Sequence, residues 1–153
     1  PAKKREPQPM DYGFVGDVNA ADINIDILKS LLDQGMFPVI SPITHDGNGQ
    51  LLNTNADTIA AALAIALSNA YETALYYCFE KKGVLSDLSN DYSVIEQLSN
   101  TAYKELKNKQ LVHAGMIPKL DNAFEALTRG VQQVVVLHAK QINDAHAGTR
   151  LVE

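Results

Sequence analysis

The chain has 153 residues and a mass of 16.7 kDa, which is enough for one domain with a sizeable core. Its formal net charge of −5 excludes a global basic field for nucleic acid, and its single cysteine, Cys78, excludes an internal disulfide. The longest apolar helix expected, about 58–67, is too short to cross a bilayer. We therefore expect a cytoplasmic protein whose partners include neither nucleic acid nor a membrane.

The first ten residues, "PAKKREPQPM", are polar and rich in proline, and they begin with Pro1 rather than a methionine. This composition predicts a flexible lead over 1–10. A basic arm for nucleic acid is the alternative, but three cations without interleaved aromatic residues support it weakly.

The stretch 11–50 predicts a strand, a helix and a second strand in that order. Gly13 and Gly16 among the alternating apolar residues of "DYGFVGDV" are typical of a short bent strand or hairpin. The next segment, "INIDILKSLLDQG", has apolar residues at helical spacing and ends at Gly35, a suitable C-cap. "MFPVIS" then predicts a short apolar strand, and "PITHDGNGQ" after it is rich in turn residues.

The rest of the chain alternates between helices and apolar strands. Helices are expected at about 58–67, from about Thr101, and over 115–130 with Pro118 in the first turn. Three apolar runs predict strands, at 72–79, 131–139 and 148–152. Strands that are apolar along their whole length are usually buried on both faces. We therefore expect an α/β fold, a three-layer αβα sandwich with a mainly parallel central sheet, in one domain over 11–153.

Three polar residues precede the alanine-rich helix at a predicted strand-to-helix junction: Asn53, Asn55 and Asp57. Alternate residues of an extended chain point the same way, and ligands gather at the carboxyl ends of parallel strands. Helix capping is the structural alternative, because an asparagine N-cap and an aspartate in the first turn stabilise a helix by roughly 1 kcal/mol each. The residues alone leave both interpretations open.

Lys119 lies in the predicted first turn of the helix over 115–130, where a cation opposes the helix dipole. A residue that breaks a local rule is typical of a functional site, and this lysine would strengthen the anion-attracting end of the helix. Gly115, which lacks a side chain, would let a ligand approach the backbone. An exposed lysine that merely tolerates its position is the alternative.

The remaining motifs give weaker signals. "EKKG" at 80–83 is either a basic loop that contacts phosphate or a solvated turn, and "HDGNGQ" favours a tight turn over a calcium loop. The histidines show no metal-ligand spacing, so no metal site is predicted. Cys78 lies in too apolar a run to suit a nucleophile.

Several of these motifs together resemble one group of enzymes. The segments "GFVGDV", "FPVISPI", "GQLLNTNAD", "GVL", "GMIPKLDNAFEAL", "GV" and "GT" are similar, in order and spacing, to the C-terminal part of the N-acetylglutamate kinases, which belong to the amino acid kinase family. The similarity spans nearly the whole chain from about Asp11. The motifs "N-x-N-A-D" and "G-M-I-P-K" are specific within the family.

The resemblance implies ATP-dependent phosphorylation of the γ-carboxylate of an N-acylated glutamate, such as N-acetylglutamate, on the route to arginine, with Mg²⁺ held mainly by the nucleotide. Asn53 would then bind the α-carboxylate of the substrate, and Asn55 would line the same pocket. Lys119 would neutralise charge on the phosphates, and Asp57 would orient Lys119 and a second lysine. The nucleotide-binding residues that the match implies are Glu80, Lys81, Lys82, Gly83, Val84, Leu85, Leu111, Val112, His113 and Gly115.

The chain also departs from the family pattern. Phe79 and Glu80 stand where the family has threonine and aspartate at the nucleotide, "HAK" at 138–140 replaces "Asp-Gly-Arg", and the segment before Gly148 is short. The chain starts where the family's sequence is already under way. We therefore expect a C-terminal fragment, inactive alone, that lacks the N-terminal lobe with its glycine-rich loop, second lysine and substrate-binding arginine.

Two alternatives to this function stay open. One is another small-molecule kinase of the same family, and the other is a catalytically inactive nucleotide-binding or assembly module, which the altered "CFEKKG" segment favours. The resemblance also implies a homo-oligomer for the full-length protein.

Overall fold

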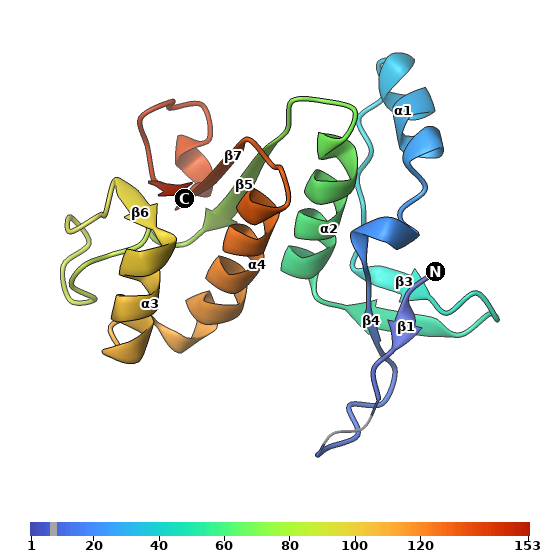
Figure 1. Ribbon diagram of the computed structural model, residues 1–153, viewed down its shortest axis with the longest axis horizontal. Coiled ribbons are helices and arrows are strands. Elements are labelled where there is room, and N and C mark those ends of the chain that lie inside the picture. Colours follow the sequence, from blue (N-terminus) through green and yellow to red (C-terminus); the bar gives the residue numbers. More distant parts are fainter. Residues whose placement is uncertain (7–8) are drawn as a thin grey trace. The chain divides into compact units, whose positions relative to one another are not determined.

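The computed structural model of the chain describes residues 1–6 and 9–153, which form two compact units (Figure 1). Unit 1 is Pro1–Asn69 and unit 2 is Ala70–Glu153. Each unit contains a four-stranded sheet and helices of its own. The sequence predicts one domain over 11–153, since it shows no second domain boundary. The division into two units follows directly on α2, and no proline-rich or glycine-rich linker marks it.

Unit 1 contains a mixed sheet with the strand order β1-β2-β4-β3. Its strands are β1 (Lys3–Lys4), β2 (Val15–Asp17), β3 (Ile43–His45) and β4 (Leu51–Thr54). β2 and β4 run parallel, whereas β1 with β2 and β3 with β4 are antiparallel. This arrangement places β4 in the interior of the sheet, with its carboxyl end at Thr54.

Strand β1 lies within the lead 1–10 that the sequence predicts to be flexible. Its backbone pairs with β2, and the Arg5 guanidinium beside it binds the Asp17 carboxylate. Hydrogen bonding to that guanidinium holds the pKa of the Asp17 carboxyl below its usual range. Backbone pairing leaves no mark in the polarity of a sequence, so composition alone did not predict this strand. Residues 7–8 of the predicted lead lie outside the described residues.

The helical segments of unit 1 are the 3-10 turn η1 (Ala20–Asp22), α1 (Ile25–Asp33) and α2 (Ala56–Ser68). α1 begins at Asn24, whose side-chain oxygen accepts the backbone N–H of Ile27 at 3.1 Å. Just beyond its C-cap lies Gly35, with a φ of +73°, a conformation that glycine adopts without strain. Both helices predicted in this part of the sequence are therefore confirmed.

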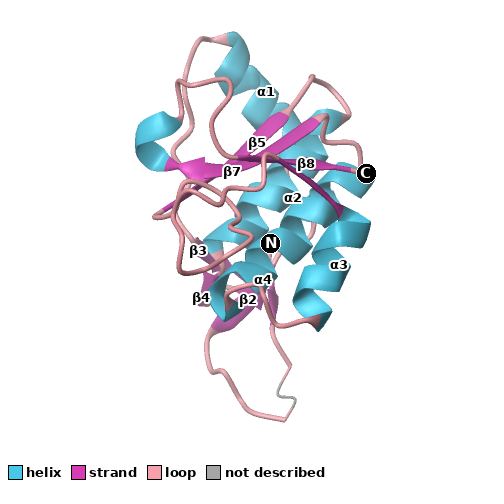
Figure 2. Cartoon of the chain, turned by 90° about the vertical axis from the view of Figure 1, so that its left-hand side faces the viewer, coloured by secondary structure: helices cyan, strands magenta, loops and turns pink. Residues whose placement is uncertain are grey.

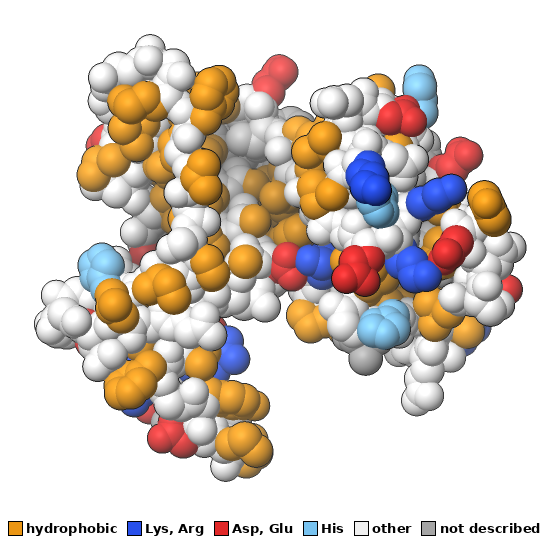
Figure 3. Space-filling model, turned by 180° about the vertical axis from the view of Figure 1, so that it is seen from behind, with side chains coloured by type: hydrophobic (Ala, Val, Ile, Leu, Met, Phe, Trp, Pro, Cys, Tyr) orange, Lys and Arg blue, Asp and Glu red, His pale blue; other side chains and the backbone are white. Residues whose placement is uncertain are grey.

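The predicted strand over 36–41 is wrong, since these residues form no strand. Phe37 and Val39 are 90% and 98% exposed, and Figure 3 shows hydrophobic side chains at the surface of unit 1, on the left of that view. An apolar run becomes a strand only where a neighbouring strand satisfies its backbone groups. Here pairing begins at Ile43, where β3 meets β4.

Unit 2 contains a second mixed sheet, in the order β5-β7-β8-β6. Its strands are β5 (Ala74–Phe79), β6 (Gln97–Ser99), β7 (Gln133–His138) and β8 (Thr149–Val152). β5 pairs parallel with β7, and β6 pairs parallel with β8, but β7 and β8 are antiparallel. The reversal has a simple cause: only residues 139–148, with the 3-10 turn η3 (Ala139–Gln141), join β7 to β8, and a parallel crossover needs a dozen or more residues.

The α/β class is confirmed, but the strands form two mixed sheets in place of one mainly parallel sheet. β7 is buried along its length, as predicted, with Val134 and Val136 fully inaccessible. β5 instead alternates: Leu75 and Tyr77 are buried, while Tyr76 is exposed. β5 is an outer strand of its sheet, which explains why an equally apolar sequence is covered on one face only.

The helices of unit 2, α3 (Asn100–Asn108) and α4 (Ile117–Thr128), lie on the same side of the sheet (Figures 1 and 2). The rings of Tyr103 in α3 and Phe124 in α4 stack with their centroids 5.2 Å apart. A further 3-10 turn, η2 (Ala114–Met116), leads directly into α4. None of the helices within residues 1–6 and 9–153 is long and apolar enough to cross a membrane.

Candidate functional site

The junction between β4 and α2 in unit 1 carries the first group of predicted site residues. Asn53 is on β4, where its side chain is exposed and its backbone N–H donates to Phe14 O at 2.8 Å. Asn55 is the N-cap of α2, and its side-chain oxygen accepts the backbone N–H of Thr58 at 3.1 Å. Capping is therefore one established task of Asn55, whereas Asn53 has no part in the cap.

Asp57 lies in the first turn of α2, one residue into the helix from Ala56. The prediction that three alternating residues point the same way therefore holds at most for Asn53 and Asn55, which precede the helix. A half-buried carboxylate at this end of a helix is stabilised by the helix dipole. Asp57 therefore lies just beyond the carboxyl end of β4, in the first turn of the helix that follows it.

The start of α4 in unit 2 carries the predicted Lys119. Met116 is the N-cap residue and forms no side-chain capping hydrogen bond, and Pro118 occupies the first turn. The turn holds no acidic residue. The N-terminal backbone N–H groups of α4 and the Lys119 ammonium therefore carry positive charge at one end of the helix, which suits an anion such as a phosphate.

Two aromatic rings face the Lys119 ammonium. Its Nζ lies 5.1 Å from the centroid of the Tyr77 ring and 5.9 Å from that of the Phe79 ring. Both rings come from β5, two residues apart, so they share one face of the strand. Phe79 is the last residue of β5, which puts the ammonium near the carboxyl end of that strand.

A cavity of about 180 Å³ opens beside this end of β5. Its lining residues are Phe79, Glu80, Lys81, Gly83, Leu85, Leu88, His113 and Met116. The volume lies below the range of about 300–1,000 Å³ that is typical of complete small-molecule sites. The cavity therefore suits one part of a larger ligand, such as a planar base against the leucine and phenylalanine side chains.

His113 and Gly115 form a tight turn just before the N-terminus of α4. His113 Nδ1 accepts the Gly115 N–H at 3.2 Å, and the Met116 N–H donates to the His113 carbonyl at 2.8 Å. A Cβ on Gly115 would lie 3.3 Å from His113 Nδ1. The missing side chain of Gly115 thus leaves room for the histidine ring, in addition to the ligand approach that the sequence suggests.

Gly83 is required by packing. A Cβ at this position would lie 2.7 Å from Thr149 Oγ1 and 2.9 Å from Val94 Cγ1. The adjacent Val84 N–H donates to the same Thr149 hydroxyl at 2.8 Å, and that threonine is fully buried. The close approach of β8 to residues 83–84 therefore fixes the inner wall of the cavity.

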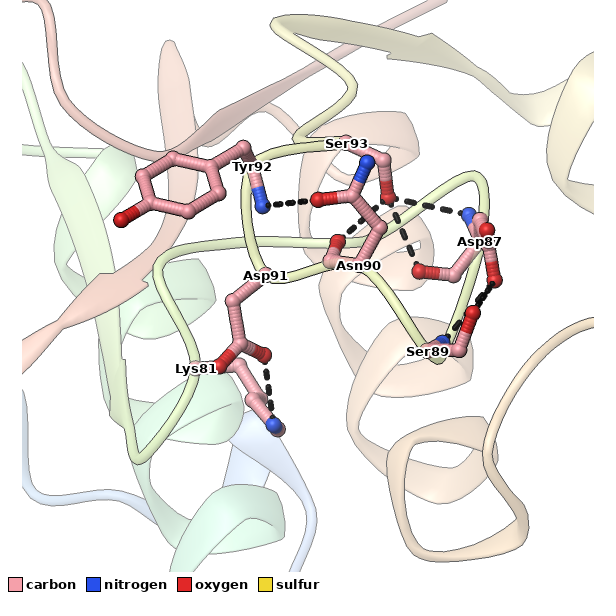
Figure 4. Close-up of polar contacts among 7 residues, drawn as sticks. All are labelled: Lys81, Asp87, Ser89, Asn90, Asp91, Tyr92 and Ser93. Carbon is pink, nitrogen blue, oxygen red and sulfur yellow. Dashed lines mark hydrogen bonds and ion pairs between the residues drawn. The ribbon is translucent and has the colours of Figure 1, made fainter.

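Charged side chains hold the loop between β5 and β6 (Figure 4). Lys81 Nζ binds the Asp91 carboxylate at 2.6 Å, and hydrogen bonding to this ammonium lowers the pKa of the Asp91 carboxyl. The neighbouring Lys82 ammonium lies 4.7 Å from the centroid of the Tyr92 ring. The two lysines that are predicted to contact the nucleotide therefore bind residues 91–92 of their own loop.

Short-range hydrogen bonds connect the residues of the segment 87–93 in this loop. The Ser93 hydroxyl lies within hydrogen-bond distance of the carbonyls of both Asp87 and Asn90, which share its one hydrogen, and the Asp87 N–H donates to the Ser93 oxygen at 3.0 Å (Figure 4). The Ser89 hydroxyl and N–H both donate to the Asp87 carboxylate, which lowers the pKa of that carboxyl. These hydrogen bonds shape the outer part of the loop, whereas residues 83–85 are held by the buried Thr149 and by pairing with residues 94–95.

The structure brings some of the predicted nucleotide-binding residues together and leaves others apart. Glu80, Lys81, Gly83, Leu85 and His113 line the cavity. The residues that do not line it are Lys82, Val84, Leu111, Val112 and Gly115. Their proposed roles stay predictions, as do those of the residues in unit 1.

Sequence reasoning missed three residues of the cavity wall: Phe79, Leu88 and Met116. Phe79 was noticed only as a departure from the family pattern, although its position at the end of an apolar strand could have identified it. Leu88 lies in a polar loop and gave no signal. No group of three or more His, Cys, Asp or Glu suited to a metal ion occurs within residues 1–6 and 9–153.

Residues 6–138 match the amino acid kinase family. The chain belongs to this family. It is 48% identical over 148 residues to acetylglutamate kinase from Parabacteroides distasonis and 49% identical over 141 residues to acetylglutamate kinase from Phocaeicola vulgatus. These matches cover 97% and 92% of the chain but 57% and 54% of the relatives. The chain therefore spans little more than half the length of these amino acid kinases.

The fold agrees with this family assignment. The chain superposes on N-acetylglutamate synthase from Neisseria gonorrhoeae with a TM-score of 0.83 at 21% identity, covering 99% of the chain and 35% of that protein. At this level of identity the likeness shows the fold alone. The α/β fold that the resemblance implied is therefore confirmed.

Proposed function

We propose that this chain supplies the nucleotide-binding half of an ATP-dependent kinase that phosphorylates the γ-carboxylate of an N-acylated glutamate. The observation that carries the proposal is the 48–49% identity with acetylglutamate kinases from two bacteria. The cavity and the Lys119 helix end of unit 2 support it, since phosphoryl transfer needs a site for the nucleotide and cations near its phosphates. On this proposal the reaction is a cytoplasmic step toward arginine.

ATP is held, on this proposal, by the cavity and the first turn of α4. The base suits the apolar side of the cavity at Leu85 and Leu88. The phosphates suit the backbone N–H groups at the start of α4, where no side-chain cap competes for them, and the ammonium of Lys119. Mg²⁺ would stay mainly on the phosphates, as is usual for this cation.

Phosphoryl transfer requires that the two substrates are positioned and that the charge on the phosphates is stabilised. A carboxylate oxygen of the acceptor forms a bond to the γ-phosphorus, the bond from that phosphorus to the β,γ-bridging oxygen breaks, and ADP leaves with the electron pair. No general base is required, because the γ-carboxylate is already ionised at neutral pH. Lys119 carries the role of neutralising charge that grows on the separating oxygens, and such a donor commonly contributes a factor of about 10²–10³ in rate.

The residues that bind the acceptor, on this proposal, are those of the β4–α2 junction in unit 1. Asn55 uses its side-chain oxygen as the helix cap, and its amide nitrogen is a donor that suits a carboxylate. Asn53 presents an exposed amide on the preceding strand. Asp57 has the role of orienting lysines through its fixed negative charge.

The remaining groups of such a site come, on this proposal, from the part of the relatives' length that the chain does not match. An exposed apolar segment in unit 1 supports a need for further polypeptide. Phe37, Val39 and Ile43 are 90%, 98% and 53% exposed, and a soluble protein rarely leaves such a run uncovered. A partner lobe that pairs with residues 36–41 would convert them into the strand that their sequence predicts.

One observation favours a second candidate function, a nucleotide-binding module without turnover. Phe79 and Glu80 replace the threonine and aspartate of the family pattern, and both line the cavity. Such a module would bind ATP and fail to transfer phosphate.

A chimera separates the two functions. We would join this chain to the unmatched part of acetylglutamate kinase from Parabacteroides distasonis and trap acyl phosphate as hydroxamate with N-acetylglutamate and N-succinylglutamate as acceptors. We expect acyl phosphate from the chimera and none above background from the 153-residue chain. A chimera that binds Mg-ATP by calorimetry but phosphorylates neither acceptor would refute the kinase and leave the module.

A further inference from the structure

Phe79 takes part in two features of unit 2 at once. Its ring lies 5.9 Å from Lys119 Nζ, and it also lines the cavity together with His113 and Met116. Tyr77 supplies the second ring, 5.1 Å from the same ammonium, and is only 3% exposed. Tyr77 does not line the cavity. The Tyr77 ring is therefore buried and outside the cavity, whereas Phe79 contacts both the ammonium and the cavity.

We propose that Tyr77 and Phe79 form an aromatic seat that positions Lys119, and that Phe79 transmits occupancy of the cavity to this ammonium. The proposal rests on the proposed function in one respect, since it takes the cavity to be the site of the nucleotide's base. Tyr77 and Phe79 are positioning residues: they act through Lys119.

Cation–π attraction explains why rings suit this task. The negative face of an aromatic ring attracts an ammonium within about 6 Å of its centroid. A ring attracts the ammonium without adding a negative charge of its own beside it, so contact with Tyr77 and Phe79 orients Lys119 without an ion pair to either residue. Lysine is flexible along its four-carbon stem, and two rings on one strand face limit the directions that its ammonium can take.

The link to the cavity follows from the position of Phe79. It is the last residue of β5 and is half-buried, so its ring is less enclosed by neighbours than that of Tyr77. A base placed against Leu85 and Leu88 would restrict the Phe79 ring, and the ring would in turn fix Lys119 before the phosphates are transferred. Binding of the base would thereby prepare the helix end for the charge of the phosphates.

The test uses adenosine, which carries no phosphate that could reach Lys119 directly. We would follow the ε-methylene NMR signals of the lysines in the 13C-labelled 153-residue chain, assigning Lys119 by the signal that Lys119→Arg removes. We expect an upfield ring-current shift for Lys119 in the free chain and a further change as adenosine binds. Phe79→Leu should reduce the shift and abolish the response to adenosine, whereas Phe79→Tyr, which keeps the ring, should preserve both.

Affinity gives an independent readout. Tyr77→Leu, which removes one ring of the seat, should lower the affinity for Mg-ATP by about three- to tenfold, the size of a partly exposed cation–π contact. Tyr77→Phe, which keeps the ring, should leave this affinity unchanged. Adenosine affinity should stay within about twofold in both variants, because Tyr77 lies outside the cavity.

The outcomes separate this inference from the proposed function. Adenosine that binds without moving the Lys119 signal would overturn the inference and leave the nucleotide site standing. A chain that binds neither adenosine nor Mg-ATP would overturn both. Equal loss of ATP affinity in Tyr77→Leu and Tyr77→Phe would also contradict the seat, because only the leucine variant lacks the ring.

Discussion

Replacing Tyr103 by phenylalanine tests how α4, the helix that carries Lys119, is held. The Tyr103 hydroxyl donates to the Asp121 carboxylate at 2.7 Å and lies 3.3 Å from the Ile117 carbonyl, so it ties α3 to the first turns of α4. The residue is 2% exposed and its ring stacks on Phe124. Tyr103→Phe keeps the ring and removes only the hydroxyl.

The size of the effect follows from what Asp121 retains. A hydrogen bond to a charged group contributes about 1.5–3 kcal/mol. Lys107 Nζ still binds both Asp121 oxygens, at 2.8 and 2.9 Å, and the carboxylate is about half exposed, so the mutation leaves no unpaired buried charge. We therefore expect a loss at the low end, ~1–2 kcal/mol, which lowers the melting temperature by about 2–8 °C in a chain of this size.

The same hydroxyl predicts a dependence on alkaline pH. Burial, and then the hydrogen bond to Asp121 and its negative charge, raise the pKa of Tyr103 well above its ordinary value of 10.0. The raised pKa means that the folded state keeps the proton when the unfolded state loses it. The stability that Tyr103 contributes is therefore complete below about pH 10 and falls as the pH rises above that value.

Urea unfolding followed by circular dichroism would measure both effects. We expect the wild-type chain to exceed Tyr103→Phe in unfolding free energy at about pH 8, and this difference to shrink at about pH 11. Equal stability of the two proteins at about pH 8, or a difference unchanged at about pH 11, would refute the reasoning.

Three further predictions concern the site. In the chimera, Asp57→Asn should lower kcat by roughly two orders of magnitude with little change in the acceptor KM, because it removes charge that acts in the transition state; unchanged kcat would return Asp57 to a purely structural role. Asn55→Ala should cost ~1 kcal/mol of unfolding free energy through the lost cap on Thr58, whereas Asn55→Asp should keep it, as thermal unfolding would show. Gly83→Ala should destabilise the chain by about 1–3 kcal/mol, because its Cβ would meet Thr149 and Val94, and a stable Gly83→Ala chain would contradict the close packing described for β8.

The helices were predictable from sequence because their signals are local. Asn24 and Gly35 mark the ends of α1, and Pro118 marks the start of α4. Each is read within a few residues of the helix that it bounds. Helix existence and type therefore followed from the sequence, with boundaries within about two residues.

The sheets were harder because strand pairing is not local. The apolar runs 36–41 and 72–79 look alike in sequence, yet only the second forms a strand, since β7 lies beside it to satisfy its backbone. The antiparallel return of β8 follows from a short connection, and the pairing of Lys3–Lys4 with β2 leaves no side-chain pattern at all. Except for the short β7–β8 connection, partners that are distant in the chain decide these features.

The site shows the same division. The motifs located Lys119 and most of the polar cavity wall, because they name chemistry at fixed positions. They missed Leu88 and Met116, which reach the cavity through packing, and they gave Phe79 no role. Val84 is predicted at the nucleotide, and its side chain is buried while its own backbone N–H donates to Thr149, so its role stays a prediction.

Calorimetric titration of the 153-residue chain with Mg-ATP tests the central claim most directly, with Lys119→Gln as the matched variant. We predict that Mg-ATP binds with a dissociation constant in the millimolar range or below and more tightly than adenosine. In Lys119→Gln, the affinity for Mg-ATP should fall to that of adenosine. Circular dichroism would verify that the variant is folded. Absence of any heat at millimolar Mg-ATP, or equal ATP affinity in the folded Lys119→Gln chain, would contradict a nucleotide site built on the cavity and the start of α4.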